Sequence, residues 1–221
     1  MNSIQVLDLA IMFISILMLA GLSNFWKRNK LSILLSGLIS FYGLVNLFWF
    51  IADWINLPNP TYAYPAIIFG YISVFFGFLF VTEIIGKYKE YLQGFGFGIL
   101  FTGLLAFLEF PLECEFVDGV YSWYYSEALH FALIPLDCLS FALPILLLIY
   151  AIYEYKDISE MVKGLILSLG FGLIFLGTYV MIPHITTSLT VSIITTLVGT
   201  IIIFVVFIVE EKFKYKLNYI K

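Results

Sequence analysis

The feature that most constrains this chain is a series of long apolar runs, each close to the length that crosses a membrane. Charge clusters, proline and glycine separate the runs. Because the core of a bilayer requires roughly 20 apolar residues per helix, the runs predict seven helices. They are placed at Ile4–Leu22, Leu31–Ile55, Tyr62–Ile85, Tyr91–Phe110, Glu127–Tyr153, Val162–Ile182 and Ile185–Val209. We therefore expect an all-α, polytopic membrane protein whose single domain, a transmembrane helical bundle, spans residues 1–221.

The composition supports this interpretation. The chain is 62% hydrophobic and 12% charged, whereas soluble domains are about 45–50% apolar and about 25% charged. This excludes an ordinary water-soluble domain, a disordered chain and a nucleic-acid binder. Residues 1–8 lack the basic segment and small-residue cleavage site of a signal peptide. We expect a multi-pass protein of the cell membrane that keeps its first helix.

The basic residues predict the orientation of the bundle. All 11 Lys and Arg residues fall in four segments that follow the first, third, fifth and seventh predicted helices. They are Lys27, Arg28 and Lys30; Lys87 and Lys89; Lys156 and Lys163; and Lys212, Lys214, Lys216 and Lys221. Seven helices place all four segments on one side, which the positive-inside rule makes cytoplasmic. The N-terminus is then outside and the C-terminus cytoplasmic.

The fifth predicted helix carries the strongest candidates for a site. Ionisable groups in hydrocarbon are costly and are functional candidates by default. At about 100° per residue, Glu127, His130 and Asp137 lie within one face of this helix. Pro135 and Pro144 flank Asp137 and are expected to kink the helix. Asp137 is either a proton donor near the bilayer midplane, helped by His130, or a protonated group hydrogen-bonded to a neighbouring helix.

Other polar residues fall near the outer ends of the helices. Glu109 and Glu113 are expected one turn apart on one face, and two nearby carboxylates suit general acid chemistry, proton handling or cation capture. Asn46 and Asp53, seven residues apart, share a face of the second helix. Asn46 is a candidate for ligand binding or for a contact with another helix.

The longest predicted loop, Pro111–Ser126, lies on the outer side. It is acidic and aromatic, and its Trp123 and Tyr125 suit the belt where rings sit among lipid head groups. The alternative is that these rings line the entrance to a ligand site.

Several kinds of chemistry lack the residues they need. No predicted helix interior contains the lysine that a retinal Schiff base requires. Two histidines do not make a convincing haem or zinc site, so we expect no metal and no cofactor. The predicted sixth and seventh helices carry small residues at four-residue spacing, which suits close helix packing.

Two stretches of the sequence look alike. Ile51–Phe80 and Pro111–Leu148 each contain an acid near an outer helix end, an aromatic turn and a new apolar helix. Membrane proteins often contain repeats with sites between the halves. The likeness indicates either an internal repeat or convergence on residues that suit the membrane interface.

This pattern resembles the small membrane-embedded lycopene cyclases of carotenoid synthesis, which look like duplicated three-helix units. The matching residues are Asp53 and Tyr62-Ala63-Tyr64 in the first unit, and Glu113, Gly119, Trp123-Tyr124-Tyr125 and Ile134-Pro135-Leu136-Asp137 in the second. The resemblance implies a seven-helix fold and an isomerase that protonates an isoprenoid with intramembrane carboxyls. The paired glutamates of the family correspond here to Asp137-Cys138 and Ser73-Val74.

Three functions remain open at this point. The first is a membrane enzyme of isoprenoid, carotenoid or other lipid metabolism, with a cyclase, hydratase or isomerase reaction. Its catalytic acids would be Asp137, His130, Glu113 and Glu109, and its substrate-binding residues Glu127, Asp53, Asn46, Trp123 and Tyr125. The second is a non-catalytic sensor or a subunit of a homo- or hetero-oligomeric membrane complex. The third is a small transporter.

Overall fold

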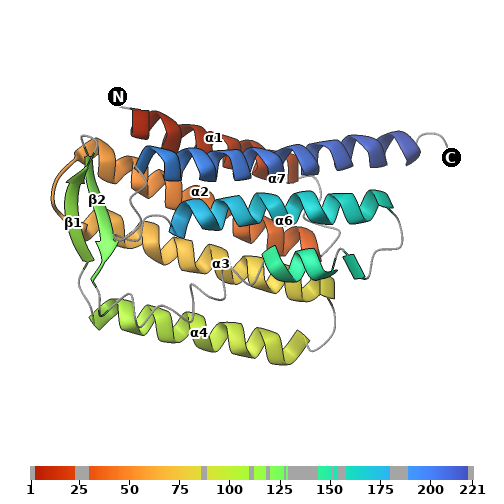
Figure 1. Ribbon diagram of the computed structural model, residues 1–221, viewed down its shortest axis with the longest axis horizontal. Helices are drawn as coiled ribbons and strands as arrows, with labels where there is room; N and C mark the ends of the chain where they lie inside the picture. The colour runs from red at the N-terminus through yellow and green to blue at the C-terminus, as the bar shows by residue number, and fades with distance from the viewer. Residues whose placement is uncertain are drawn as a thin grey trace.

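The computed structural model describes residues 3–22, 30–85, 89–109, 112–117, 120–126, 128, 144–150, 152–153, 158–179 and 189–218 (Figure 1). Apart from one two-stranded hairpin, the regular structure is helical. The long helices are α1 (Ser3–Leu22), α2 (Lys30–Ile55), α3 (Ala63–Ile85), α4 (Lys89–Glu109), α6 (Ile158–Tyr179) and α7 (Leu189–Asn218). Residues 144–150 are also helical and fall within the predicted fifth helix. The turn between α2 and α3 contains the 3-10 helix η1 (Pro60–Tyr62).

Six predicted helical runs are confirmed, with ends that shift by a few residues. The largest difference is α7, which continues past the predicted end at Val209 to Asn218. The added segment contains Glu and Lys and no Pro or Gly, and Glu and Lys are strong helix formers. Hydropathy marks where the apolar run ends and does not mark where the helix ends.

The described helices form an antiparallel bundle. Helix α2 packs on α1 and α3, α4 packs on α3, α6 packs on α7, and α7 also packs on α1. Figure 1 shows that α1 begins and α2 ends at the same end of the bundle, beside the hairpin. We call this the hairpin end and the opposite end, where α2 begins, the Lys30 end.

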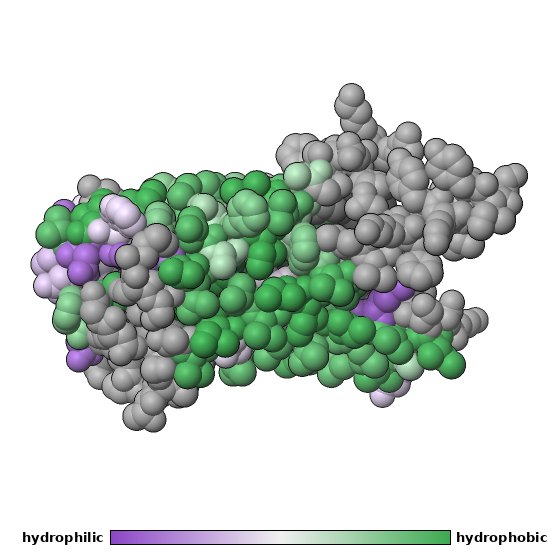
Figure 2. All heavy atoms as spheres, turned by 90° about the horizontal axis from the view of Figure 1, so that it is seen from above, coloured by the Kyte–Doolittle hydropathy of each residue, from purple (hydrophilic) through white to green (hydrophobic). Residues whose placement is uncertain are grey.

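The outward surface of the bundle is apolar. Two described helical segments, Ile33–Ile55 and Ala63–Glu83, are long and apolar enough to cross a membrane. Figure 2 shows apolar side chains over the middle of one face, with hydrophilic residues toward its ends. Large exposed apolar residues include Val6, Phe13, Phe97, Phe101, Leu105, Leu169 and Val205. Soluble monomers rarely expose contiguous apolar patches above a few hundred Å².

The prediction of a loop at Pro111–Ser126 is wrong, because this segment contains an antiparallel β-hairpin. Strand β1 (Leu112–Val117) pairs with β2 (Val120–Tyr125), and the register pairs Val117 with Val120. The two intervening residues are Asp118 and Gly119. An Asp-Gly pair between two strand-forming runs is a strong hairpin signal, and it predicts the hairpin better than the polarity of the segment does.

The two stretches of the proposed repeat differ at their aromatic turns. In the first stretch the turn is the 3-10 helix η1, in which the Asn59 side chain accepts a hydrogen bond from the Thr61 N–H at 3.0 Å. In the second stretch it is the β-hairpin. The likeness in sequence at these turns does not extend to their backbone structure.

Helices α6 and α7 approach each other closely at two glycines. A Cβ atom added to Gly199 would lie 2.6 Å from the Gly170 carbonyl oxygen. The small-residue face of α6 has a different neighbour, because the Ser168 hydroxyl donates to the Pro144 carbonyl at 2.6 Å. Small residues do allow close packing at the α6–α7 crossing, but they are Gly170 and Gly199 and not the four-residue stripe of α6 that contains Ser168.

Candidate functional site

Two buried carboxyl groups meet at the hairpin end, between α1 and α2. Asp8 lies in the second turn of α1 and Asp53 near the end of α2, and their side chains are 5% and 6% exposed. The two side chains lie close enough to interact directly with each other. The Gln5 side chain adds a second contact between the helices, donating to the Asp53 carbonyl oxygen at 2.9 Å.

A hydrogen bond between two carboxyl groups requires a proton. An ionised carboxylate only accepts hydrogen bonds, so one of the two groups must donate. Helix α1 contains no Lys or Arg, and the Lys30 of α2 lies at the opposite end from Asp53. No cation on these two helices is therefore placed to neutralise the pair. Asp8 and Asp53 are therefore two adjacent carboxyl groups that could hold a proton between them in a buried setting.

A line of polar groups continues from this pair along α2 toward the centre of the bundle. Asn46 is 5% exposed and donates to the Tyr42 carbonyl oxygen at 2.7 Å. The Tyr42 hydroxyl lies 3.0 Å from the Thr200 hydroxyl of α7. Tyr42, Asn46 and Asp53 lie within one face of α2 at four- and seven-residue spacing. Helix α7 thus joins α1 and α2 around this polar face.

The proton in the contact between Tyr42 and Thr200 can be assigned to tyrosine. The Thr200 hydroxyl donates its hydrogen to the Thr196 carbonyl oxygen at 2.8 Å. A hydroxyl has one hydrogen and two acceptor lone pairs. Thr200 must then accept, and Tyr42 must donate. Every hydrogen of this pair of hydroxyls is used inside the bundle, which is how polar groups persist in an apolar environment.

The hairpin covers the same end of the bundle. Val120 of β2 is 1% exposed and belongs to a buried cluster with Ile11 of α1 and Ile193 of α7. Asn56, which follows α2, accepts a hydrogen bond from the Tyr121 N–H at 3.1 Å. The hairpin is therefore attached both to the end of α2 and to the α1–α7 contact, close to the aspartate pair.

The sequence-predicted site residues fall into three groups. Asp53 and Asn46 are buried on one face of α2, as their spacing predicts, and Trp123 is buried in the main core at 5% exposure. Glu109 ends α4 and Glu113 lies in β1, and both are exposed. These two do not share a helix face, because the chain enters a strand after Pro111. Tyr125 lies in β2. The placements of Glu127, His130 and Asp137 lie outside the described residues.

Asp8 is the residue that the sequence-based search missed. It is the one ionisable residue within the first apolar run, Ile4–Leu22. That isolation was the available signal, since an acid in a predicted membrane helix is a functional candidate by default. Asp8 lies near the start of the first predicted helix, where a polar residue is expected at a helix end. Nothing in the sequence indicates that α1 lies beside Asp53.

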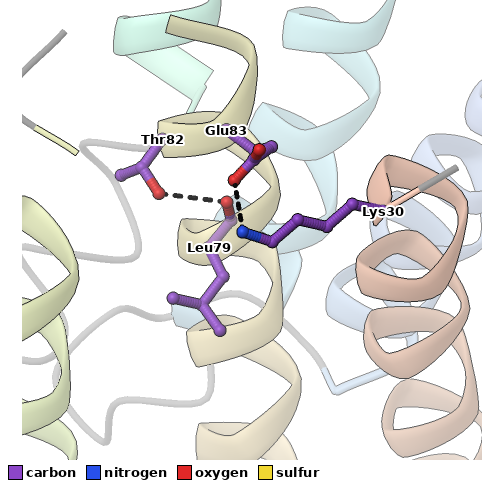
Figure 3. Close-up of polar contacts among 4 residues, drawn as sticks. All are labelled: Lys30, Leu79, Thr82 and Glu83. Atoms are coloured by element: carbon purple, nitrogen blue, oxygen red, sulfur yellow. Dashed lines mark hydrogen bonds and ion pairs between the residues drawn. The ribbon is translucent and has the colours of Figure 1, made fainter. Parts of the chain in front are cut away.

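A half-buried acid at the Lys30 end has a different kind of partner. Glu83, near the end of α3, forms an ion pair with Lys30 at 3.0 Å. Figure 3 shows the pair beside the Thr82 hydroxyl, which donates to the Leu79 carbonyl at 3.0 Å. This ion pair links the end of α3 to the start of α2.

Comparisons with protein-family models, with curated proteins and with solved structures found no match to this chain. The function therefore has to be argued from the site itself.

Proposed function

We propose that this chain is a membrane-embedded acid catalyst that acts on an apolar, unsaturated lipid of the isoprenoid class. The observation that carries the proposal is the burial of two adjacent carboxyls, Asp8 and Asp53, at one end of the bundle. A proton donor in an apolar, water-poor setting is what protonation of a carbon–carbon double bond requires. The sequence analysis predicted Asp137, His130, Glu113 and Glu109 as the catalytic residues. This proposal assigns the acid to Asp8 and Asp53 instead.

We also propose that the bundle spans the membrane seven times, with its N-terminus outside and its C-terminus cytoplasmic. The exposed apolar surface and the two membrane-length segments support this placement. Lys30, Lys89 and Lys163 lie at or near the starts of α2, α4 and α6, and Lys212, Lys214 and Lys216 lie near the end of α7. In this antiparallel bundle those positions share one end, so the positive-inside rule makes the Lys30 end cytoplasmic. The aspartate pair is then near the outer side.

The reaction class follows from the chemistry of the pair. The shared proton adds to one carbon of a double bond and leaves a carbocation on the other. A second double bond of the same substrate molecule attacks that cation and closes a ring. Loss of a proton to the carboxylate restores the pair, so the product is an isomer of the substrate. Attack by water in place of the double bond would give a hydrated product.

An assay in cells tests this function. The protein is expressed in a host that accumulates an acyclic carotenoid, and extracted lipids are separated by chromatography and weighed by mass spectrometry. We expect a product of unchanged mass with a new retention time. Asp53→Asn keeps the side-chain shape and removes the transferable proton, so the product should disappear. Glu109→Gln, which alters an exposed carboxyl, is the matched control and should leave the product in place.

Two results would count against the enzyme. One is formation of the product by Asp53→Asn at the rate of the unmodified chain. The other is a lipid extract unchanged by expression across acyclic carotenoids and shorter isoprenoid substrates, with a folded, membrane-inserted protein.

A second candidate, a subunit of a membrane complex, is favoured by α4. This helix packs mainly on α3 among the described elements, and Figure 1 shows it at the edge of the bundle. Its exposed apolar residues are Tyr91, Phe97, Phe101, Leu105 and Leu108. Crosslinking from cysteines placed at Phe101 and Leu105 in native membranes tests this candidate. A specific crosslinked band supports it, and labelling by lipid alone argues against it.

A further inference from the structure

The hairpin packs against α1, α7 and the end of α2 at the hairpin end, near the aspartate pair. Val120 packs between Ile11 of α1 and Ile193 of α7 with 1% of its surface exposed. Leu7, the neighbour of Asp8, packs against the same cluster. The side chain of one hairpin residue thus seals the seam between the first and last helices, next to the carboxyl that α1 contributes.

The hairpin is also attached to the helix that carries the second carboxyl. Asn56 has a left-handed backbone conformation, with φ at 48°, and its N–H donates to the Ala52 carbonyl at 2.8 Å. This conformation ends α2 and turns the Asn56 side chain toward β2, where it accepts from the Tyr121 N–H. Asn56 is three residues after Asp53. A change at this hydrogen bond therefore acts on the end of the helix that bears the acid.

We propose that the hairpin is a gate that controls the access of water to the Asp8–Asp53 pair. This inference rests on the proposed function, in which the pair is the acid. In the closed state shown here, Val120 seals the seam between α1 and α7, and Asn56 holds the strand in place. Closure keeps water away from a carbocation, which water would trap as an alcohol, and opening lets the pair exchange its proton with the outer aqueous phase.

Carbodiimide labelling measures this access without an activity assay. A carbodiimide takes the carboxyl proton on one nitrogen while the carboxylate oxygen bonds to its central carbon. The apolar dicyclohexylcarbodiimide reaches buried carboxyls through the apolar phase, and a water-soluble carbodiimide with added glycinamide reaches those in contact with water. Peptide mass spectrometry of the purified full chain in lipid nanodiscs then gives the labelled fraction of each acid.

In the unmodified protein, we expect dicyclohexylcarbodiimide to label Asp8 or Asp53. The water-soluble reagent should label Glu113 and Glu115, which are exposed, and spare the aspartates. Val120→Ala opens the seam, and Asn56→Gly keeps a residue that tolerates the left-handed turn while deleting the acceptor for Tyr121. Each variant should raise labelling of the aspartates by the water-soluble reagent about tenfold, which corresponds to about 1.4 kcal/mol of lost closure free energy.

Phe116→Ala is the matched control, because Phe116 lies on the same hairpin and is 59% exposed. It should leave the labelling of the aspartates unchanged, which separates the gate from a general loosening of the hairpin.

The outcomes distinguish the gate from the acid. Unmodified protein whose aspartates react with the water-soluble reagent as fast as Glu113 would overturn the gate. So would Val120→Ala and Asn56→Gly variants that fold, bind dicyclohexylcarbodiimide and still exclude the water-soluble reagent. Suppose that dicyclohexylcarbodiimide labels neither aspartate in the unmodified protein, while both variants let the water-soluble reagent reach them. That result supports the gate and contradicts the proposal that the pair is the catalytic acid.

Discussion

The two ends of the bundle beside α2 each hold a buried or half-buried acid, and they pair it in opposite ways. At the Lys30 end, Glu83 meets a cation whose side chain is 59% exposed. At the hairpin end, Asp53 meets a second acid, Asp8, and both are nearly inaccessible. The first arrangement keeps a charge and anchors a helix end near water. The second keeps a proton where water is scarce.

This contrast separates a structural acid from a chemical one. An ion pair with one exposed partner adds little stability, because solvent screens it. A pair of buried polar groups costs free energy that apolar residues would not. Under the proposed function, the return for that cost is a transferable proton.

The largest expected effect is on the reaction rate. Asp8→Asn should lower product formation by about 100- to 10,000-fold, the usual contribution of a general acid, because an amide has no proton to give to a double bond. Glu83→Gln should leave the rate unchanged. The carotenoid-host assay measures both, and equal losses in the two variants would erase the distinction between the two ends of α2.

The next effect is on stability. The double variant with Asp8→Leu and Asp53→Leu should be more stable by about 1–4 kcal/mol, since apolar residues replace a buried polar pair. Asp8→Leu alone should be less stable by about 1–3 kcal/mol, because Asp53 then lacks its partner. Unfolding of the purified protein in mixed detergent reports both values. A double variant that is less stable than either single variant would contradict the assignment.

A smaller effect is expected at the Lys30 end. Lys30→Met should cost at most about 1 kcal/mol, because the ammonium group is largely in solvent. The loss should shrink further at high ionic strength. The same unfolding experiment, repeated across salt concentrations, provides the check. A salt-independent loss of several kcal/mol would indicate that the Lys30–Glu83 pair is shielded from solvent.

The smallest effect concerns the hydroxyls that join α7 to α2. Tyr42→Phe and Thr200→Val, combined in a double-mutant cycle, should give an interaction free energy of about 0.6 kcal/mol, the average for side-chain hydrogen bonds inside membrane proteins. Thr102→Val is the control, because the Thr102 hydroxyl donates to the Gly98 carbonyl of its own helix at 2.9 Å and is exposed. A larger interaction free energy would indicate that the Tyr42–Thr200 contact belongs to the same polar site as Asp53.

Much of the fold was predictable because the lengths of the apolar runs determine the helices. Spacing along one helix also placed Asp53 and Asn46 on a common buried face. What spacing could not show was which helices touch. Asp8 gained its role from the α1–α2 contact, and Thr200 met Tyr42 through a contact across 158 residues of sequence. Single-helix periodicity carries no information about either partner.

The hairpin was missed for another reason. Its composition was interpreted as membrane-interface chemistry, whereas its two-residue Asp118-Gly119 separator is turn chemistry. Val120 and Trp123 are buried in the structure, so these residues serve packing. The prediction of an aromatic belt stays open for Tyr125.

The contact between the first and last helices has a consequence for how the protein is made. Ribosomes add about 5–20 residues per second, so Thr200 is added about 8–30 s after Tyr42, given a separation of 158 residues. Throughout that interval Tyr42, Asn46 and the aspartate pair lack the wall that α7 provides. A chain that stalls before α7 keeps a polar face open along α1 and α2. The arrival of α7 therefore covers a polar face that quality-control factors could recognise on a shorter nascent chain.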